Sequence, residues 1–199
     1  MAERLVLDLF CEDSGHEVFV TNLVRVMARS LEAPEPLVKP ISARGGHGRA
    51  ISELKTWQRG LLKGSLTRGD ALIVLIDANS TGWRAMDREI RAAIDASLYP
   101  HVLVGCPDPH VEVWCAADPA AFQGLFSAPV PPAPARGGRL IYKQWLRNAL
   151  EEAGNMVLGD PMDISLDLLP EMDLNRACRN DASLSHLVGD LRALLQRTR

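Results

Sequence analysis

Cysteines are few in this sequence, and none is placed for a structural zinc site. The four thiols, Cys11, Cys106, Cys115 and Cys178, form no C-x-x-C pair, and no histidine spacing completes a set of zinc ligands. Cysteines used in this way are typical of reduced thiols in a reducing compartment. We therefore expect a cytoplasmic protein without disulfides.

Long apolar runs and several familiar catalytic motifs are also missing. No stretch approaches the roughly 18 apolar residues of a membrane span, and the start, MAERLVLDLF, is too short and too acidic for a signal peptide. We therefore expect no membrane partner. The chain contains no G-x-x-x-x-G-K-[ST], so it has no Walker A motif of its own. It also contains no G-x-S-x-G, which disfavours a serine hydrolase.

An overall excess of positive charge is absent, although one segment carries one. The chain has 22 Lys and Arg against 25 Asp and Glu, a net charge of −3. Between Lys39 and Arg68 the net charge is +6, because only Glu53 opposes seven basic residues, and the remainder is −9. Such a patch attracts phosphates. The residues there that we predict to bind nucleic acid are Arg44, His47, Arg49, Lys55, Arg59 and Lys63.

Each of these basic features also has a simpler interpretation. The glycines of RGGHGR, residues 44–49, would let backbone amides approach a phosphate. His47 is either a loop histidine in water or a proton carrier. Lys55, Arg59 and Lys63 recur every four residues, which is equally typical of a solvated helix face.

Hydrophobic periodicity predicts an alternation of strands and helices. We expect strands at 4–11, 37–43, 70–79 and 101–109, and helices at 16–31, 50–64 and 82–97, with a short helix within 111–118. Pro40 makes the second strand an edge strand or an irregular one. The apolar run in DALIVLIDAN is typical of a parallel strand buried on both faces. This order predicts an α/β fold with a mostly parallel sheet flanked by helices, Rossmann-like in arrangement.

The later part of the chain differs in composition. Residues 127–138, SAPVPPAPARGG, indicate a Pro/Ala/Gly linker or long loop. We therefore predict an α/β domain over 1–126 and a helical C-terminal appendage over 139–199, with helices near 139–153 and 183–196.

Acidic residues follow three of the predicted strands. Glu12 ends the first, Asp77 ends the third with Asn79 close behind, and Glu112 and then Asp118 follow the fourth. Ligand sites in open parallel sheets form at the carboxyl ends of the strands, so these side chains should converge. Clustered carboxylates repel one another, and a divalent cation relieves that repulsion. Oxygen ligands alone suit Mg²⁺ or Mn²⁺ better than zinc. Singly, each acid could instead cap a helix or face water.

The order of these motifs resembles the TOPRIM domain of topoisomerases, primases and OLD-family nucleases. LFCEDSGHEVFV corresponds to its Glu motif and ALIVLIDAN to its D-x-D motif, while HVEVWCAAD is similar to an E-x-W-x-x-A-D stretch of small stand-alone bacterial relatives. Lys143 and the segment 179–187 are counterparts of a Lys and an Arg/Ser segment in their helical tail. Two departures stand out. Asp13 replaces the glycine after the family Glu, and Asn79 replaces the second acid of D-x-D.

The resemblance implies a metal-dependent nuclease in bacterial defence against phage or plasmids. Glu12, Asp77 and Glu112 would be catalytic, with Glu12 a metal ligand or general base and Asp77 the central ligand. The implied ligands of Mg²⁺ or Mn²⁺ are Glu12, Asp77, Asn79, Glu112 and Asp118. Asn79 brings no charge, which weakens a second metal position. Lys143 would contact the nucleic acid, DNA rather than RNA.

Partners and alternatives follow from the same resemblance. Because the chain has no Walker A motif, an ATPase or another defence subunit would act in trans, and a homodimer is a further option. One alternative is a non-catalytic TOPRIM-like subunit that binds nucleic acid or a partner ATPase, which Asn79 favours. Another is a domain that binds a nucleotide or small phosphate through RGGHGR.

Overall fold

The computed structural model describes residues 4–43, 47–79 and 81–197, without the side chains of residues 47 and 48. Its centre is a sheet of four parallel strands in the order β2-β1-β3-β4: β1 Val6–Cys11, β2 Leu37–Ser42, β3 Ala71–Leu75 and β4 Val102–Gly105. Every residue of β3 is buried, as its apolar run predicts. β2 contains Pro40 and lies at an edge, where a missing amide hydrogen is tolerated.

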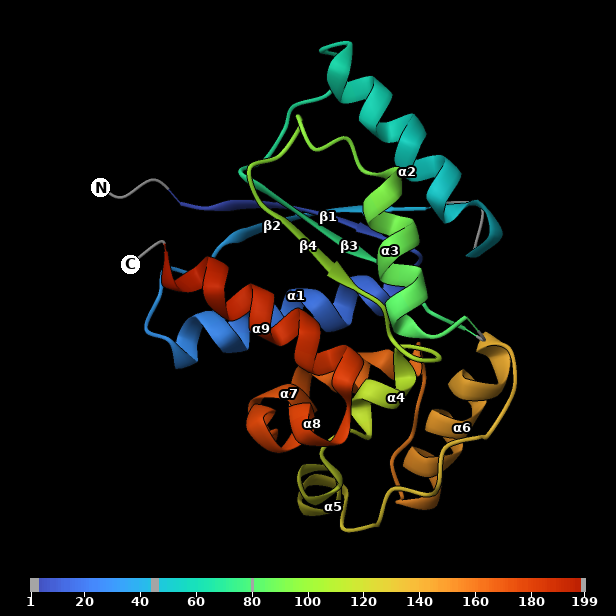
Figure 1. Ribbon diagram of the computed structural model, residues 1–199. Helices are drawn as coiled ribbons and strands as arrows, with labels where there is room; N and C mark the ends of the chain where they lie inside the picture. Colours follow the sequence, from blue (N-terminus) through green and yellow to red (C-terminus); the bar gives the residue numbers. More distant parts are fainter. Residues whose placement is uncertain (1–3, 44–46, 80, 198–199) are drawn as a thin grey trace.

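Three helices cross between the strands and cover both faces of the sheet. α1 (Ser14–Ser30) packs on one face, and α2 (His47–Leu62) and α3 (Trp83–Ala93) pack on the other (Figure 1). β2, the next strand in the chain, lies on one side of β1. β3 lies on the other side of β1, and β4 lies beyond β3. Right-handed crossovers in opposite directions place their helices on opposite faces. The predicted α/β fold with a parallel sheet is confirmed.

Alternation along the central strand divides the core in two. Ile73 and Leu75 face α1, whereas Leu72 and Val74 face α2 and α3. Successive side chains of a strand point to opposite faces. A strand buried on both sides must therefore be apolar throughout, which β3 is.

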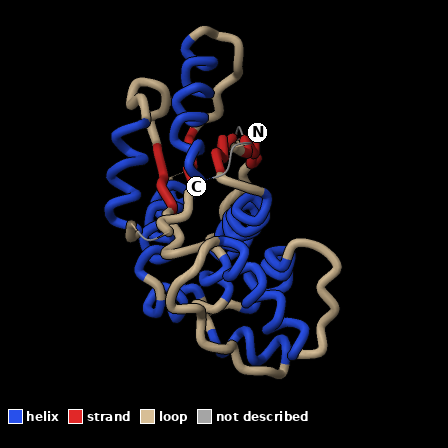
Figure 2. Tube along the Cα trace, turned by 90° about the vertical axis from the view of Figure 1, so that its right-hand side faces the viewer, coloured by secondary structure: helices blue, strands red, loops and turns tan. Residues whose placement is uncertain are grey.

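The remaining helices enlarge the α1 side of this core. They are α4 (Glu112–Cys115), α5 (Pro119–Phe126), α6 (Arg139–Glu152), the 3-10 turn η1 (Pro161–Ile164), α7 (Ser165–Glu171), α8 (Leu174–Asn180) and α9 (Ala182–Gln196). Figure 2 shows the strands in the upper half of the molecule, flanked by helices, whereas the lower half of the drawn chain consists of helices and loops. Leu146 of α6 and Leu187 of α9 share one apolar cluster with Leu9 of β1. The C-terminal helical region thus packs directly on the sheet and α1.

Several predicted elements hold and others were missed. The helices predicted at 139–153 and 183–196 are α6 and α9, and residues 127–138 contain no helix or strand. The predicted boundaries at 126 and 138 stay a prediction. Sequence periodicity did not indicate α5, η1, α7 or α8, which are all eight residues or shorter. Within the described ranges, no helix combines the length and apolar character that crossing a membrane requires.

Candidate metal centre

The sheet order creates a crevice at the carboxyl ends of β1 and β3. The chain leaves β1 towards β2 on one side and leaves β3 towards β4 on the other, so α1 and α3 depart on opposite faces. Ligands of open α/β sheets bind at such a topological switch point. Glu12 directly follows β1, and Asp77 follows β3 by two residues. The predicted convergence of these two acids therefore occurs at the place where the topology favours a site.

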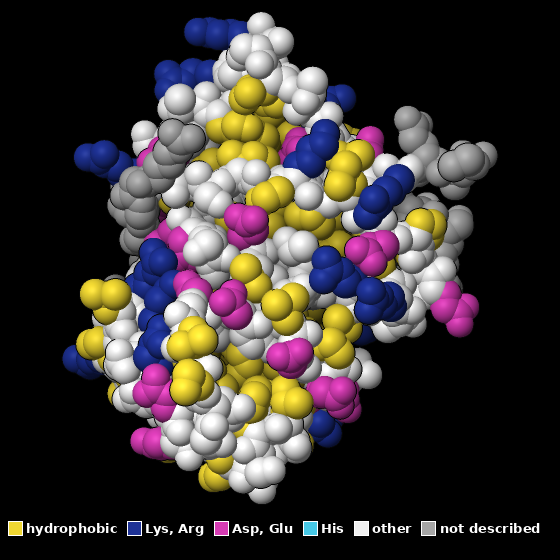
Figure 3. Space-filling view, turned by 180° about the vertical axis from the view of Figure 1, so that it is seen from behind, with side chains coloured by type: hydrophobic (Ala, Val, Ile, Leu, Met, Phe, Trp, Pro, Cys, Tyr) yellow, Lys and Arg dark blue, Asp and Glu magenta, His cyan; other side chains and the backbone are white. Residues whose placement is uncertain are grey.

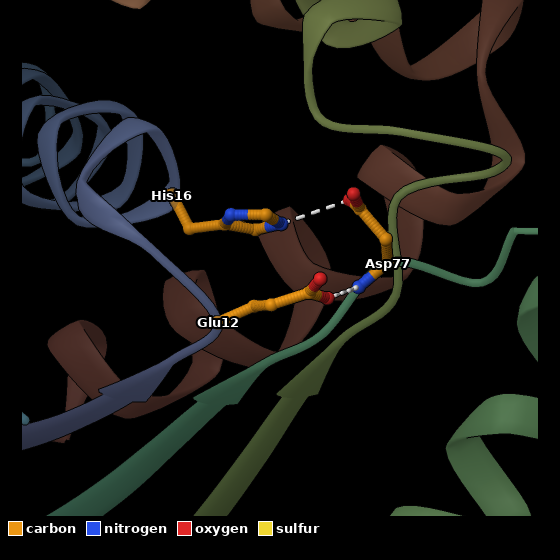
Figure 4. Close-up of side chains that lie close together, drawn as sticks. All are labelled: Glu12, His16 and Asp77. Atoms are coloured by element: carbon orange, nitrogen blue, oxygen red, sulfur yellow. Dashed lines mark hydrogen bonds and ion pairs between the residues drawn. The ribbon is translucent and has the colours of Figure 1, made fainter. Parts of the chain in front are cut away.

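Three side chains meet in this crevice: Glu12, His16 and Asp77. Each offers one ligand atom, and these atoms lie within 4.8 Å of one another. The residues are 3%, 0% and 1% exposed. Figure 4 shows Glu12 from the end of β1 and His16 from the first turn of α1, both directed at Asp77. A cluster of this kind could hold a metal ion.

His16 bridges two carboxylates. Its Nδ1 lies 2.8 Å from Oδ1 of Asp13, and its Nε2 lies 2.8 Å from Oδ1 of Asp77. Asp13 also caps α1, because its Oδ1 accepts the backbone N–H of His16 at 3.1 Å. Burial would lower the pKa of His16, but attraction to Asp77 and the hydrogen bonds to both acids raise the pKa to about 10. Without a metal, His16 is therefore an imidazolium whose positive charge offsets part of the negative charge of Asp13 and Asp77.

Asp77 is the most heavily bonded group of the site. Its Oδ2 lies 2.7 Å from Nδ1 of His110, and its Oδ1 also accepts the backbone N–H of Val111 at 3.0 Å. The ring of His110 packs against that of Tyr142, with centroids 4.7 Å apart. Although burial opposes ionisation, the two histidines hold the pKa of Asp77 below its usual range. Asp77 is thus a fixed anion at the centre of the crevice.

Glu112, in the first turn of α4, is a buried carboxylate left without hydrogen bonds. The residue is 1% exposed, and neither carboxylate oxygen has a hydrogen-bond partner among the described residues. Burial and the negative charge of Asp77 raise its pKa to about 7, against the opposing effects of its own backbone N–H and of the positive charges of His16 and Lys143. A buried polar group without a partner is rare and calls for a cause, such as a bound ion. Glu112 directly follows Val111, whose backbone N–H binds Asp77, but it is not one of the three residues whose ligand atoms lie within 4.8 Å of one another.

The structure places the other two predicted ligands differently. Both oxygens of Asp118 bind Arg176, at 2.5 and 2.8 Å, and the same carboxylate accepts the backbone amides of Ala121 and Asp173. Asp118 therefore caps α5 and ties it to α8, and it has no free lone pair directed at the cluster. The side-chain amide of Asn79 donates to the backbone carbonyl of Asp77 at 3.2 Å, so Asn79 shapes the turn after β3.

Basic side chains approach the crevice from α6. Arg139 pairs with Asp13, and Lys143 pairs with Asp160 and acts electrostatically on Glu112. Arg139 was not predicted from the sequence, whereas Lys143 was. Both lie in the first two turns of α6, and both side chains are more than half buried.

The basic residues of α2 lie elsewhere. Lys55 and Arg59 are exposed on α2, and Lys63, also exposed, directly follows the last residue of this helix; the three are here called the α2 stripe. α2 runs from the carboxyl edge of the sheet to its amino edge. Figure 3 shows Lys and Arg side chains around the upper part of the molecule, where α2 lies. Arg49, also exposed, lies in the first turn of α2, at the carboxyl edge of the sheet. Arg44 and the side chain of His47 lie outside the described residues.

Sequence reasoning missed the two histidines of the site. His16 stands four residues after Glu12, and a strand that passes directly into a helix brings both to one crevice. His110 lies in the loop after β4, in PDPHVE, two residues before Glu112. Their bonds to Asp77 span 61 and 33 residues of chain, which local patterns do not reveal.

Comparisons with protein-family models, with curated proteins and with solved structures find no match for this chain.

Proposed function

We propose that this protein is a divalent-metal-dependent phosphodiester hydrolase, a nuclease of the TOPRIM-like kind that its motifs resemble. The observation that supports this most strongly is the convergence of Glu12 and Asp77 at the switch point between β1 and β3. Glu112 adds a buried carboxylate without a hydrogen-bond partner among the described residues. Three acids in one dry crevice are stable together only if cations or protons offset their charge.

The residues present fit a divalent cation. Glu12 and Asp77 would hold it, and Mg²⁺ or Mn²⁺ is the ion that such oxygen ligands favour. When bound, the ion would polarise a phosphoryl oxygen and make water a stronger nucleophile at neutral pH.

The chain's own groups would do the remaining work. Without a metal, Glu112 has a pKa of about 7, so this carboxyl can accept or donate a proton near neutral pH. His110 holds Asp77 in one orientation through the 2.7 Å contact. Arg139 and Lys143 bring positive charge from α6 to the edge of the crevice, where a phosphate would be attracted.

The biological setting is proposed from the motif resemblance alone. It is defence against phage or plasmids, with DNA before RNA as the substrate and an ATPase or another subunit as a partner in trans.

The test is cleavage of supercoiled plasmid, linear DNA and RNA in Mg²⁺, Mn²⁺ or EDTA. Wild type is compared with Asp77→Asn, which keeps the shape of the side chain, and with Asp167→Asn, an exposed acid on α7 as the matched control. We expect cleavage that needs metal, survives Asp167→Asn and is lost in Asp77→Asn. Cleavage in EDTA, or undiminished cleavage by folded Asp77→Asn, would refute the proposal.

A second candidate is a non-catalytic subunit of the same fold. It is favoured by Asn79, which lacks the second D-x-D charge and turns its amide to the backbone of Asp77. This candidate predicts nucleic-acid binding without cleavage by wild type in any metal. It also predicts that Asp77→Asn leaves the binding unchanged.

A further inference from the structure

We propose that His16 is a direct metal ligand through Nε2, and that the centre therefore takes a first-row transition-metal ion of the Mn²⁺ type in preference to Mg²⁺. The inference rests on the metal centre of the proposed function and names the ion class that it selects.

The first support is the orientation of the imidazole. Asp13 engages Nδ1 at 2.8 Å, which leaves Nε2 directed at Asp77 beside Glu12 (Figure 4). A histidine that ligates a metal almost always donates its other ring N–H to a carboxylate or carbonyl, which fixes the ring and raises its basicity. Asp13 is itself fixed, because it caps α1 and pairs with Arg139. The supporting shell of a ligating histidine is therefore already built.

The second support is the rigidity of the turn that carries His16. His16 is fully buried in the first turn of α1. A Cβ added at the preceding Gly15 would lie 2.9 Å from Cγ of Met162 and 3.2 Å from Oδ1 of Asp13. Only glycine leaves η1 and the Asp13 carboxylate this close to the helix start. The packing thus holds the imidazole at a defined place in the crevice.

The third support is the charge around the cluster. Glu112 is a buried carboxylate without a hydrogen-bond partner among the described residues, and it directly follows Val111, whose backbone N–H binds Asp77 at 3.0 Å. A hydrogen-bonded His16 alone leaves that carboxylate uncompensated. A dication bound at Glu12, His16 and Asp77 would compensate it.

The donor set decides the class of ion. Mg²⁺ takes oxygen ligands and gives up its water reluctantly, whereas imidazole nitrogen favours first-row transition metals. Two carboxylates and one imidazole form a mixed set that Mn²⁺ and its neighbours accept. Coordination uses the lone pair of Nε2, so the proton that His16 shares with Asp77 leaves to solvent when the metal binds.

The test measures metal binding directly. Loss of the electron paramagnetic resonance signal of free aqueous Mn²⁺ gives its affinity for the full-length protein, and displacement by Mg²⁺ gives the preference. The variants are His16→Gln and Asp13→Asn. The second keeps the ligand but removes the negative charge that supports His16 and pairs with Arg139. His101→Gln, at the amino end of β4 and so at the opposite edge of the sheet, is the matched control. Circular dichroism establishes that each variant is folded.

We expect wild type and His101→Gln to bind Mn²⁺ at least about tenfold more tightly than Mg²⁺. Asp13→Asn should weaken Mn²⁺ binding roughly 10–100-fold, the usual effect of losing such a support. His16→Gln should weaken it at least as much, with a smaller effect on Mg²⁺.

Three results would overturn the inference. They are equal affinity of wild type for Mn²⁺ and Mg²⁺, Mn²⁺ binding that is unchanged in both folded variants, and an absence of Mn²⁺ binding by wild type. The plasmid assay separates this failure from that of the proposed function. Metal-dependent cleavage by a protein without a preference for Mn²⁺ over Mg²⁺ would refute only the inference about His16. Mn²⁺ binding through His16 without cleavage would refute only the proposed nuclease function.

Discussion

Replacing Glu112 by glutamine should stabilise the metal-free protein at alkaline pH. Burial raises the pKa of Glu112 from 4.5 to about 7. Between these values the folded protein keeps a proton that the unfolded chain has released, so the free energy of unfolding falls as pH rises. Each tenfold change in proton affinity corresponds to about 1.4 kcal/mol, so by pH 8 the ionisation of Glu112 lowers the free energy of unfolding of the wild type by roughly 3 kcal/mol. Glutamine has the same shape as glutamate but no charge, so the free energy of unfolding of Glu112→Gln does not fall in this way.

The assay is urea unfolding of wild type and Glu112→Gln in EDTA between pH 5 and pH 8. The two proteins should be similar in stability near pH 5, and the variant should gain up to roughly 3 kcal/mol near pH 8. Glu171→Gln, an exposed acid at the end of α7, is the matched control and should follow wild type. A stability difference that does not change with pH, or one that favours wild type at pH 8, would refute the idea of an uncompensated carboxylate.

Three further predictions concern the surroundings of the site. Asp118→Asn should lower the free energy of unfolding by about 2 kcal/mol, because it weakens the charge-assisted hydrogen bonds to Arg176. Its Mn²⁺ affinity should stay at the wild-type value. A loss of metal binding in the folded variant would instead support Asp118 as a ligand. Gly105→Ala should cost roughly 1–3 kcal/mol in thermal unfolding, because its Cβ would lie 2.3 Å from Cδ1 of Leu75, and unchanged stability would contradict that packing. The salt dependence of DNA binding can be measured by fluorescence anisotropy with labelled DNA. Lys143→Gln should reduce this dependence by about one phosphate contact, whereas alanine at all three positions of the α2 stripe should leave it unchanged. The reverse outcome would place the DNA on α2.

The parallel sheet could be predicted because its signals are local. β3 is buried on both faces, and that burial requires the uninterrupted apolar run seen in the sequence. The carboxyl-edge position of Glu12 and Asp77 followed from the same reasoning, since all parallel strands end at one edge. What the sequence could not supply was the order of the strands, which puts β1 beside β3 and so makes these two acids neighbours.

The histidines and the short helices show where local patterns fail. His16 and His110 acquire their meaning only from bonds to Asp77 across the sheet. Asp118 illustrates the opposite case. The local sequence signal for a helix start was present, but Asp118 was interpreted as a metal ligand. An Asp followed by Pro is a typical helix start, and Asp118 and Pro119 are indeed the N-cap and first residue of α5. Asp160, followed by Pro161, and Asp173 are likewise the N-caps of η1 and α8, and both elements are too short for periodicity to appear.

The central claim is that Glu12 and Asp77 hold a metal that the protein uses to cut a phosphodiester. Its most direct measurement is the rate of plasmid cleavage in Mn²⁺ by wild type, Glu12→Gln and Glu17→Gln. Glu17 is a glutamate in the first turn of α1 that accepts a hydrogen bond from Ser42. We predict that wild type and Glu17→Gln cut at similar rates and that Glu12→Gln is slower by roughly 10²-fold or more. Equal rates for all three folded proteins, or no cleavage by wild type, would contradict the claim.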